Sequence, residues 1–82
     1  MSNSQTYTQD GMAFTLFTIA NDIASIVYEV VNEAGIHCGE VHAIKLGGNE
    51  FSYYGRPNMD PELDLHCADF ADALEYAISG TL

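Results

Sequence analysis

Cysteine and histidine occur side by side twice, as His37-Cys38 and His66-Cys67, and His42 lies near the first pair. Thiolate and imidazole are common zinc ligands, but structural zinc sites bring ligands in pairs separated by two to four residues. Adjacent residues of a strand point to opposite faces, so each dipeptide would offer one ligand. We therefore predict no metal site and no cofactor, with Cys67 packed in the core. A Cys38–Cys67 disulfide is possible, although a cytosolic chain normally keeps its thiols reduced.

A cysteine nucleophile paired with a histidine base is the catalytic alternative. Residues 35–39, Gly-Ile-His-Cys-Gly, and residues 67–74, Cys-Ala-Asp-Phe-Ala-Asp-Ala-Leu, resemble the histidine strand and cysteine helix of small papain-like isopeptidases. The resemblance implies Cys67 as the nucleophile, activated at a helix N-terminus, with His37 as its base. It covers about half of the chain and lacks the family's Asn-Cys-Asn at the cysteine. Cys67 also falls on the buried side of its segment, where thiols are inert, so we predict a protein that is not an enzyme.

Charge is the most unusual property of the sequence, because twelve Asp and Glu oppose one Lys and one Arg, for a formal net charge of −10. Residues 1–44 and 57–82 contain no Lys or Arg and carry net charges of −5 and −6. Binding to a nucleic acid backbone requires a positive face, and anionic membranes attract basic segments, so we predict direct binding to neither. Without a leader-like start or a long apolar run, we expect a soluble, cytoplasmic protein.

The first half of the chain predicts a long helix. Residues 1–10 are polar and are expected to be flexible. Apolar residues then follow at steps of three and four, namely Leu16, Ala20, Ile23, Val27, Val30 and Ala34. Gly35 would end this helix over 12–34. Residues 12–19 are also rich in strand-forming types, which leaves a first strand as the alternative.

The second half predicts a hairpin and a short helix. Strands over 40–46 and 50–54 flank Gly47-Gly48-Asn49, a typical tight-turn sequence. Residues 62–67 alternate as in a third strand, although Asp60-Pro61-Glu62 also has the form of a helix start. From Ala68 the pattern is helical and ends at Gly80. We therefore expect one α+β domain over 1–82, with the order α-β-β-β-α.

The predicted first helix also suggests self-association. Its apolar arc spans about 200°, whereas burying one face against a core requires roughly 100°. A domain of this size has little else to cover the surplus. We therefore predict a homodimer whose interface contains Phe17, Ala24, Tyr28 and Val31.

The acidic residues suggest a binding function. In the predicted helices, two rows of carboxylates would replace phosphates in a basic groove on another protein. The residues assigned to this surface are Asp22, Glu29, Glu33, Asp64, Asp69, Asp72 and Glu75. In size and charge the chain resembles small acidic phage anti-CRISPR and anti-restriction proteins, which implies a non-enzymatic inhibitor of a basic, nucleic-acid-binding protein or complex. Two alternatives are an interaction module that uses exposed Tyr28, Tyr53 and Tyr54, and acidity that serves solubility alone.

Overall fold

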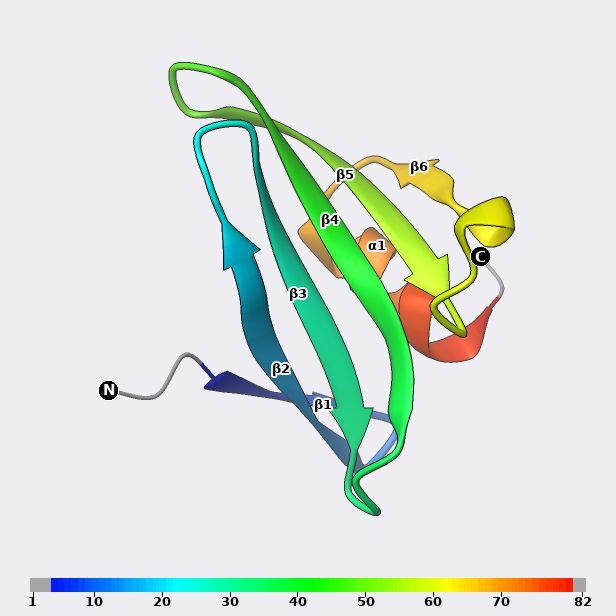
Figure 1. Ribbon diagram of the computed structural model, residues 1–82. Helices are drawn as coiled ribbons and strands as arrows, with labels where there is room; N and C mark the ends of the chain where they lie inside the picture. The colour runs from blue at the N-terminus through cyan, green and yellow to red at the C-terminus, as the bar shows by residue number, and fades with distance from the viewer. Residues whose placement is uncertain (1–3, 81–82) are drawn as a thin grey trace.

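A computed structural model of the protein describes residues 4–80, in which six strands precede a single α-helix (Figure 1). In chain order the elements are β1 (Ser4–Gln9), β2 (Met12–Asn21), β3 (Ser25–Asn32), β4 (His37–Gly47), β5 (Glu50–Pro57), the 3-10 helix η1 (Pro61–Leu63), β6 (Leu65–Cys67) and α1 (Phe70–Ser79). Each strand pairs antiparallel with the next, so the spatial order of the strands is the chain order. The fold is a six-stranded antiparallel meander with one C-terminal helix.

The two faces of the sheet differ in what covers them. Helix α1 packs against β4, β5 and β6 on one face, here called the helix face, and lies behind the sheet in Figure 1. Buried residues of this face include Leu16 and its cross-strand partner Val30. The other face, here called the open face, has no helix packed on it within residues 4–80. Cross-strand pairs on the open face include Phe17–Glu29, Glu40–Arg56 and His42–Tyr54.

The predicted long helix over 12–34 is wrong, and the α-β-β-β-α order with it. Residues 12–21 and 25–32 instead form β2 and β3, in agreement with the alternative of a strand over 12–19. Asp22 closes the turn between them, because its carboxylate accepts hydrogen bonds from the N–H groups of Ala24 (2.8 Å) and Ser25 (2.9 Å). Ile23, which the helical pattern placed in the core, is 95% exposed in this turn. Gly35 does not end a helix; its φ of 81° belongs to the turn between β3 and β4.

The N-terminal segment contains a further strand that the sequence analysis missed. Residues 4–9, expected to be flexible, form β1, while residues 1–3 lie outside the described part of the chain. Gln9 pairs with Met12 around a two-residue turn. Asp10 and Gly11 in this turn have φ values of 53° and 77°. Positive φ at both central positions is the requirement of a type I′ hairpin turn, for which Asp-Gly is a preferred sequence.

The second half of the chain follows the sequence analysis more closely. The hairpin is confirmed, with β4 and β5 joined through Gly47 and Gly48, both at positive φ. The C-terminal helix is also confirmed: Asp69 caps its N-terminus and Gly80 adopts the left-handed conformation at its end. The two alternatives for residues 60–67 both occur in part. Asp60 caps the short η1, and a strand of three residues, β6, follows it.

Two glycines allow α1 to approach the sheet closely. A Cβ atom on Gly55 would lie 2.6 Å from the carbonyl oxygen of Ala73, and one on Gly39 would lie 2.7 Å from that of Ala77. Ala73 and Ala77 are themselves fully buried. Leu74 of α1, together with Val30 and Val41 of the sheet, forms the centre of the core. The backbone of α1 therefore rests directly on the backbones of β4 and β5.

Candidate functional site

Half of the chain's twelve Asp and Glu residues come from residues 60–75, a stretch of 16 residues that begins at the end of the loop after β5. They lie on and around η1 and on the start and length of α1, the two elements that precede and follow β6 in the chain (Figure 1). This surface is here called the acidic edge, and its members are Asp60, Glu62, Asp64, Asp69, Asp72 and Glu75. Its concentration of negative charge makes it the strongest candidate for a partner-binding site.

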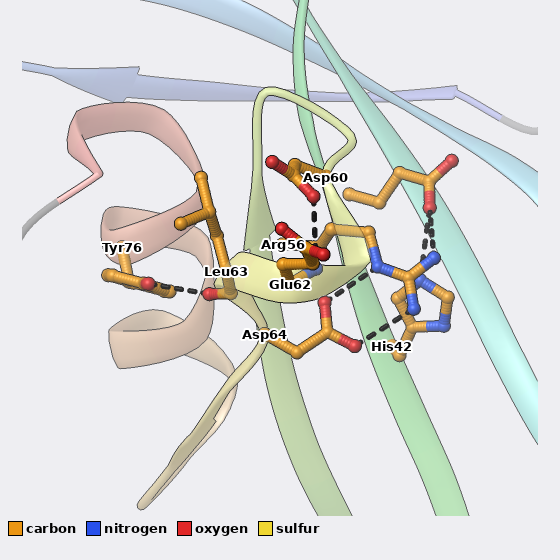
Figure 2. A network of polar contacts seen from close by, with 8 residues as sticks. His42, Arg56, Asp60, Glu62, Leu63, Asp64 and Tyr76 are labelled. Carbon is orange, nitrogen blue, oxygen red and sulfur yellow. Dashed lines mark hydrogen bonds and ion pairs between the residues drawn. The ribbon is translucent and has the colours of Figure 1, made fainter.

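Arg56 of β5 attaches the η1 segment to the sheet (Figure 2). Its Nε donates to Asp64 Oδ1 at 2.7 Å and its Nη2 to Asp64 Oδ2 at 2.9 Å, a bidentate pair. Its Nη1 also donates to Glu40 Oε1 at 3.4 Å on the neighbouring strand, and the same oxygen contacts His42 Nε2 at 3.0 Å. The hydrogen bonds from Arg56 lower the pKa of Asp64, while those to Asp64 raise the pKa of Arg56. Both side chains therefore stay charged over the physiological pH range.

Further hydrogen bonds hold η1 against α1. The Tyr76 hydroxyl of α1 donates to the carbonyl oxygen of Leu63 at 2.6 Å, which Figure 2 shows beside the helix. Asp60 accepts from the N–H of Glu62 at 3.0 Å and so caps η1. The sheet contact through Arg56 and the helix contact through Tyr76 hold the segment from both sides. The backbone of η1 is thus held in place relative to the sheet and to α1.

The six carboxylates divide into structural and unengaged groups. Asp69 accepts from the N–H of Asp72 at 2.9 Å and caps α1, as Asp60 caps η1. Asp64 belongs to the pair with Arg56. The carboxylates of Glu62, Asp72 and Glu75 make no hydrogen bond or ion pair within residues 4–80, and all three residues are exposed. These last three are available to an incoming partner.

Lys45, the chain's other cation, forms its hydrogen bonds at the turn between β2 and β3 and not with the acidic edge. Lys45 Nζ donates to the carbonyl oxygen of Asp22 at 2.6 Å and to Asn21 Oδ1 at 3.3 Å, at the turn between β2 and β3. Backbone hydrogen bonds from Ala24 and Ser25, followed by the charge of Lys45, lower the pKa of Asp22. With Arg56 bound to Asp64 and Glu40, neither cation opposes the unengaged carboxylates of the acidic edge.

The predicted acidic row on a first helix is not formed. Asp22 lies in the turn after β2, where it holds backbone N–H groups. Glu29 lies in the middle of β3 on the open face, where its carboxylate contacts His37 Nδ1. Glu33 lies in the turn after β3 and accepts from the N–H of Ala13 at 3.4 Å. The structure therefore separates these three residues. Of the predicted acidic residues of the second half, Asp64 lies between η1 and β6, and Asp69, Asp72 and Glu75 lie at the N-terminus of α1 or on it.

The residues predicted for a dimer interface do not share a surface either. Phe17 and Val31 lie on the open face, 43% and 9% exposed. Tyr28 lies on the helix face and packs edge-on against Phe70, with ring centroids 5.3 Å apart. Ala24 is in the turn between β2 and β3. The apolar arc on which the dimer prediction depended is absent because the helix is absent.

The histidine and cysteine residues are distributed over both faces of the sheet. His37 contacts Glu29 on the open face, whereas Cys67 is 5% exposed on the helix face and donates to the carbonyl oxygen of Leu65 at 3.4 Å. Burial raises the pKa of the Cys67 thiol, and the charges of Asp72 and Asp69 raise it further. Both cysteines are free, and residues 4–80 contain no group of three His, Cys, Asp or Glu side chains suited to a metal ion. The geometry does not bring the predicted thiol and base together.

The three tyrosines of the alternative hypothesis are also divided between the faces. Tyr28 and Tyr53 both contact the ring of Phe70 on the helix face. Tyr54 lies on the open face, where its ring centroid is 5.1 Å from that of His66. The alternation of residues 51–54 along a strand predicts this division of Tyr53 from Tyr54.

Comparison with family models, curated proteins and solved structures finds no match for this chain. In residues 4–80, no helix has both the length and the apolar character needed to cross a membrane.

Proposed function

We propose that the protein is a non-enzymatic binding protein that uses the acidic edge to engage a basic, nucleic-acid-handling protein or complex and thereby inhibits or modulates it. The observation that carries this proposal is the position of Glu62, Asp72 and Glu75. Their carboxylates are exposed and unengaged. Glu62 lies on η1, which the Arg56–Asp64 pair and the Tyr76 hydroxyl hold in place, and Asp72 and Glu75 lie on α1. A basic groove that normally receives phosphates would receive these carboxylates instead.

The distribution of charge supports this proposal over a purely solubilising role. Solubility requires net charge but no particular placement of it. Here six carboxylates gather within 16 residues. The two cations leave Glu62, Asp72 and Glu75 unpaired, because Lys45 binds at the turn between β2 and β3 and Arg56 binds Asp64 and Glu40. Electrostatic attraction between such a surface and a basic groove would increase the association rate about 10- to 1,000-fold, and this gain would weaken as salt increases. The resemblance in size and charge to phage anti-CRISPR and anti-restriction proteins supports the same class of partner.

Two triple variants with the same change in charge test the proposal. The edge variant removes the unengaged carboxylates (Glu62→Gln, Asp72→Asn, Glu75→Gln), and the turn variant removes carboxylates elsewhere (Asp10→Asn, Glu33→Gln, Glu50→Gln). Each protein is immobilised and incubated with nuclease-treated cell lysate at about 50 mM salt, where charge effects are strong. Bound proteins are then eluted with duplex DNA in one sample and with salt in another.

We expect the parent protein and the turn variant to capture the same basic proteins, and duplex DNA to release them. The edge variant should capture at least about tenfold less, because three exposed ion pairs of up to about 1 kcal/mol each are lost. Equal loss in both variants would show that total charge alone matters. If duplex DNA does not release the captured proteins, the acidic edge does not bind at a nucleic-acid-binding groove.

A further inference from the structure

A pocket of about 290 Å³ opens on the helix face at the N-terminal end of α1. Four of its lining residues are aromatic, namely Tyr28, Phe51, Tyr53 and Phe70. Ile26, Ala43 and Gln5 complete the lining. We call this the aromatic pocket.

The pocket exists because a small residue lies between larger ones. Across β3, β4 and β5, Ala43 pairs with Ile26 on one side and with Tyr53 on the other. Ala43 is 3% exposed and forms the floor, while its longer neighbours form walls. The curl of the sheet brings Gln5 of β1 to the same hollow. In Figure 1, β1 crosses the sheet at a wide angle to β4.

The aromatic rings are arranged around Phe70, the first residue of α1. Tyr28 and Tyr53 both stand nearly perpendicular to Phe70, at 79° and 77°, with ring centroids 5.3 Å and 6.0 Å away. Phe51 stacks on Tyr53 at 6.0 Å and extends that wall. Aromatic faces carry partial negative charge and attract cations, most strongly where water is excluded.

The charges around the pocket favour a cationic occupant. Asp69 directly precedes Phe70, and Cys67, two residues earlier, pairs with Tyr53 across β5 and β6. The mouth of the pocket therefore adjoins the acidic edge in a chain of net charge −10. Lys45, opposite Phe51, binds Asn21 and the carbonyl of Asp22 and does not line the pocket.

We propose that the aromatic pocket receives an arginine side chain of the basic partner, and this inference rests on the proposed function of the acidic edge. The volume is at the lower limit for sites that hold whole small molecules, about 300 Å³, and suits a single side chain. A planar guanidinium stacks on aromatic rings and is more weakly hydrated than an ammonium, so it loses less on entering the pocket. The pocket would thus add specificity for arginine to an otherwise general attraction between opposite charges.

The test is an NMR titration with three peptides, acetyl-Gly-Xaa-Gly-amide with arginine, citrulline or leucine at the centre. Citrulline is the neutral counterpart of arginine and has nearly the same shape. We expect the arginine peptide to shift the ring resonances of Tyr53 and Phe70 in a saturable way. It should bind at least about fivefold more tightly than the citrulline peptide, as a cation–π contribution would give.

Two neighbouring tyrosines provide matched variants. Tyr53→Leu removes a wall of the pocket and should abolish the preference for arginine over citrulline. Tyr54→Leu changes the open face and should leave the preference for arginine unchanged. Ala43→Leu should fill the floor and block binding, and if it does not fold, the Tyr53 and Tyr54 variants still decide the matter.

Three results would overturn the pocket proposal. The citrulline or leucine peptide could shift the resonances as much as the arginine peptide does, or Tyr54→Leu could abolish the preference for arginine. The arginine peptide could also shift only resonances of the acidic edge. The titration needs no natural partner, so its failure is separate from the failure of the capture experiment. If the arginine peptide binds in the pocket but both triple variants capture partners equally well, the proposed role of the acidic edge is wrong and the pocket proposal stands.

Discussion

Removal of Arg56 should destabilise the fold and also weaken partner binding, even though it makes the protein more negative. Arg56→Met deletes the bidentate pair with Asp64 and the longer contact with Glu40. The Arg56 and Asp64 side chains are 23% and 32% exposed, between the fully exposed and the fully buried cases. Exposed pairs contribute less than about 1 kcal/mol, whereas breaking a buried pair costs about 3–5 kcal/mol. We therefore expect Arg56→Met to lower the free energy of unfolding by about 2 kcal/mol, a large share of the total for a small domain.

The pairwise part of this effect is measured by a double-mutant cycle of Arg56→Met and Asp64→Asn. Urea unfolding at pH 7, followed by far-ultraviolet circular dichroism, gives the four free energies of unfolding. The expected coupling is about 1 kcal/mol, because the paired groups are partly screened by water. A coupling below about 0.3 kcal/mol, within the usual error of additivity, would refute the importance of the pair.

The coupling should also depend on pH in a defined direction. Arg56 lowers the pKa of Asp64 below its ordinary value of 3.8, so the unfolded chain takes up a proton at this carboxyl before the folded protein does. The stabilisation is therefore complete above about pH 4 and is lost as the pH falls through the folded-state pKa. A coupling that does not decrease as the pH is lowered from 7 to below 3.8 would contradict this assignment.

Partner capture by the Arg56→Met variant distinguishes the effect of net charge on binding from the effect of carboxylate placement. A model based on charge alone predicts stronger capture, because one positive charge is removed. The structure predicts weaker capture, since Glu62 and its neighbours lose their attachment to the sheet. Stronger capture by a folded Arg56→Met protein would show that the placement of the acidic edge is unimportant.

Three further predictions concern the helix and the thiols. Asp69→Ala should cost about 1 kcal/mol in urea unfolding through loss of the N-cap, whereas Asp69→Asn should be nearly neutral; equal losses would argue against capping. Gly55→Ala should cost more than about 2 kcal/mol, because its Cβ would lie 2.6 Å from the Ala73 carbonyl oxygen, and a loss below about 0.5 kcal/mol would show that α1 shifts freely. With a thiol reagent at pH 8, Cys38 should react rapidly and Cys67 only as the protein unfolds, since Cys67 is 5% exposed and burial raises its thiol pKa. Rapid reaction of the remaining thiol in Cys38→Ser would contradict the packing of β6 under α1.

The hairpin and the C-terminal helix could be predicted from sequence because local chemistry specifies them. Gly47 and Gly48 supply the positive φ of a turn, and Asp69 and Gly80 cap a helix. The first hairpin carried an equally local signal in Asp10-Gly11, which the polar character of the flanking residues obscured.

The segment over 12–34 could not be assigned from periodicity alone. Strands β2 and β3 place apolar residues on both faces, with Leu16 on the helix face and Val27 on the open face, so they do not alternate strictly. Their spacing then coincides with helical steps of three and four. The turn between them contains neither Gly nor Pro and depends on the Asp22 carboxylate. A helix and two strands were therefore both consistent with this part of the sequence.

The candidate site was only partly accessible to sequence reasoning. The concentration of acidic residues after Pro57 is visible in the sequence, and it led to Asp64, Asp69, Asp72 and Glu75. The pairing of Asp64 with Arg56, and the hydrogen bond from Tyr76 to Leu63, depend on how η1 folds back beside β5 and α1. Such contacts follow from tertiary structure and have no periodic signature.

The close seating of α1 on Gly39 and Gly55 has a consequence for recognition. A helix whose backbone lies this close to the backbone of its sheet has little room to slide or rotate, so the sheet sets the backbone positions from which its carboxylates and the ring of Phe70 extend. Association with a partner then requires the ordering of side chains but little further ordering of the main chain. Because ordering loops and side chains subtracts from the free energy of binding, a preorganised surface of this kind retains more of its contact energy as affinity. The two glycines contact no partner in this proposal, but they would reduce the entropy that is lost when the partner binds.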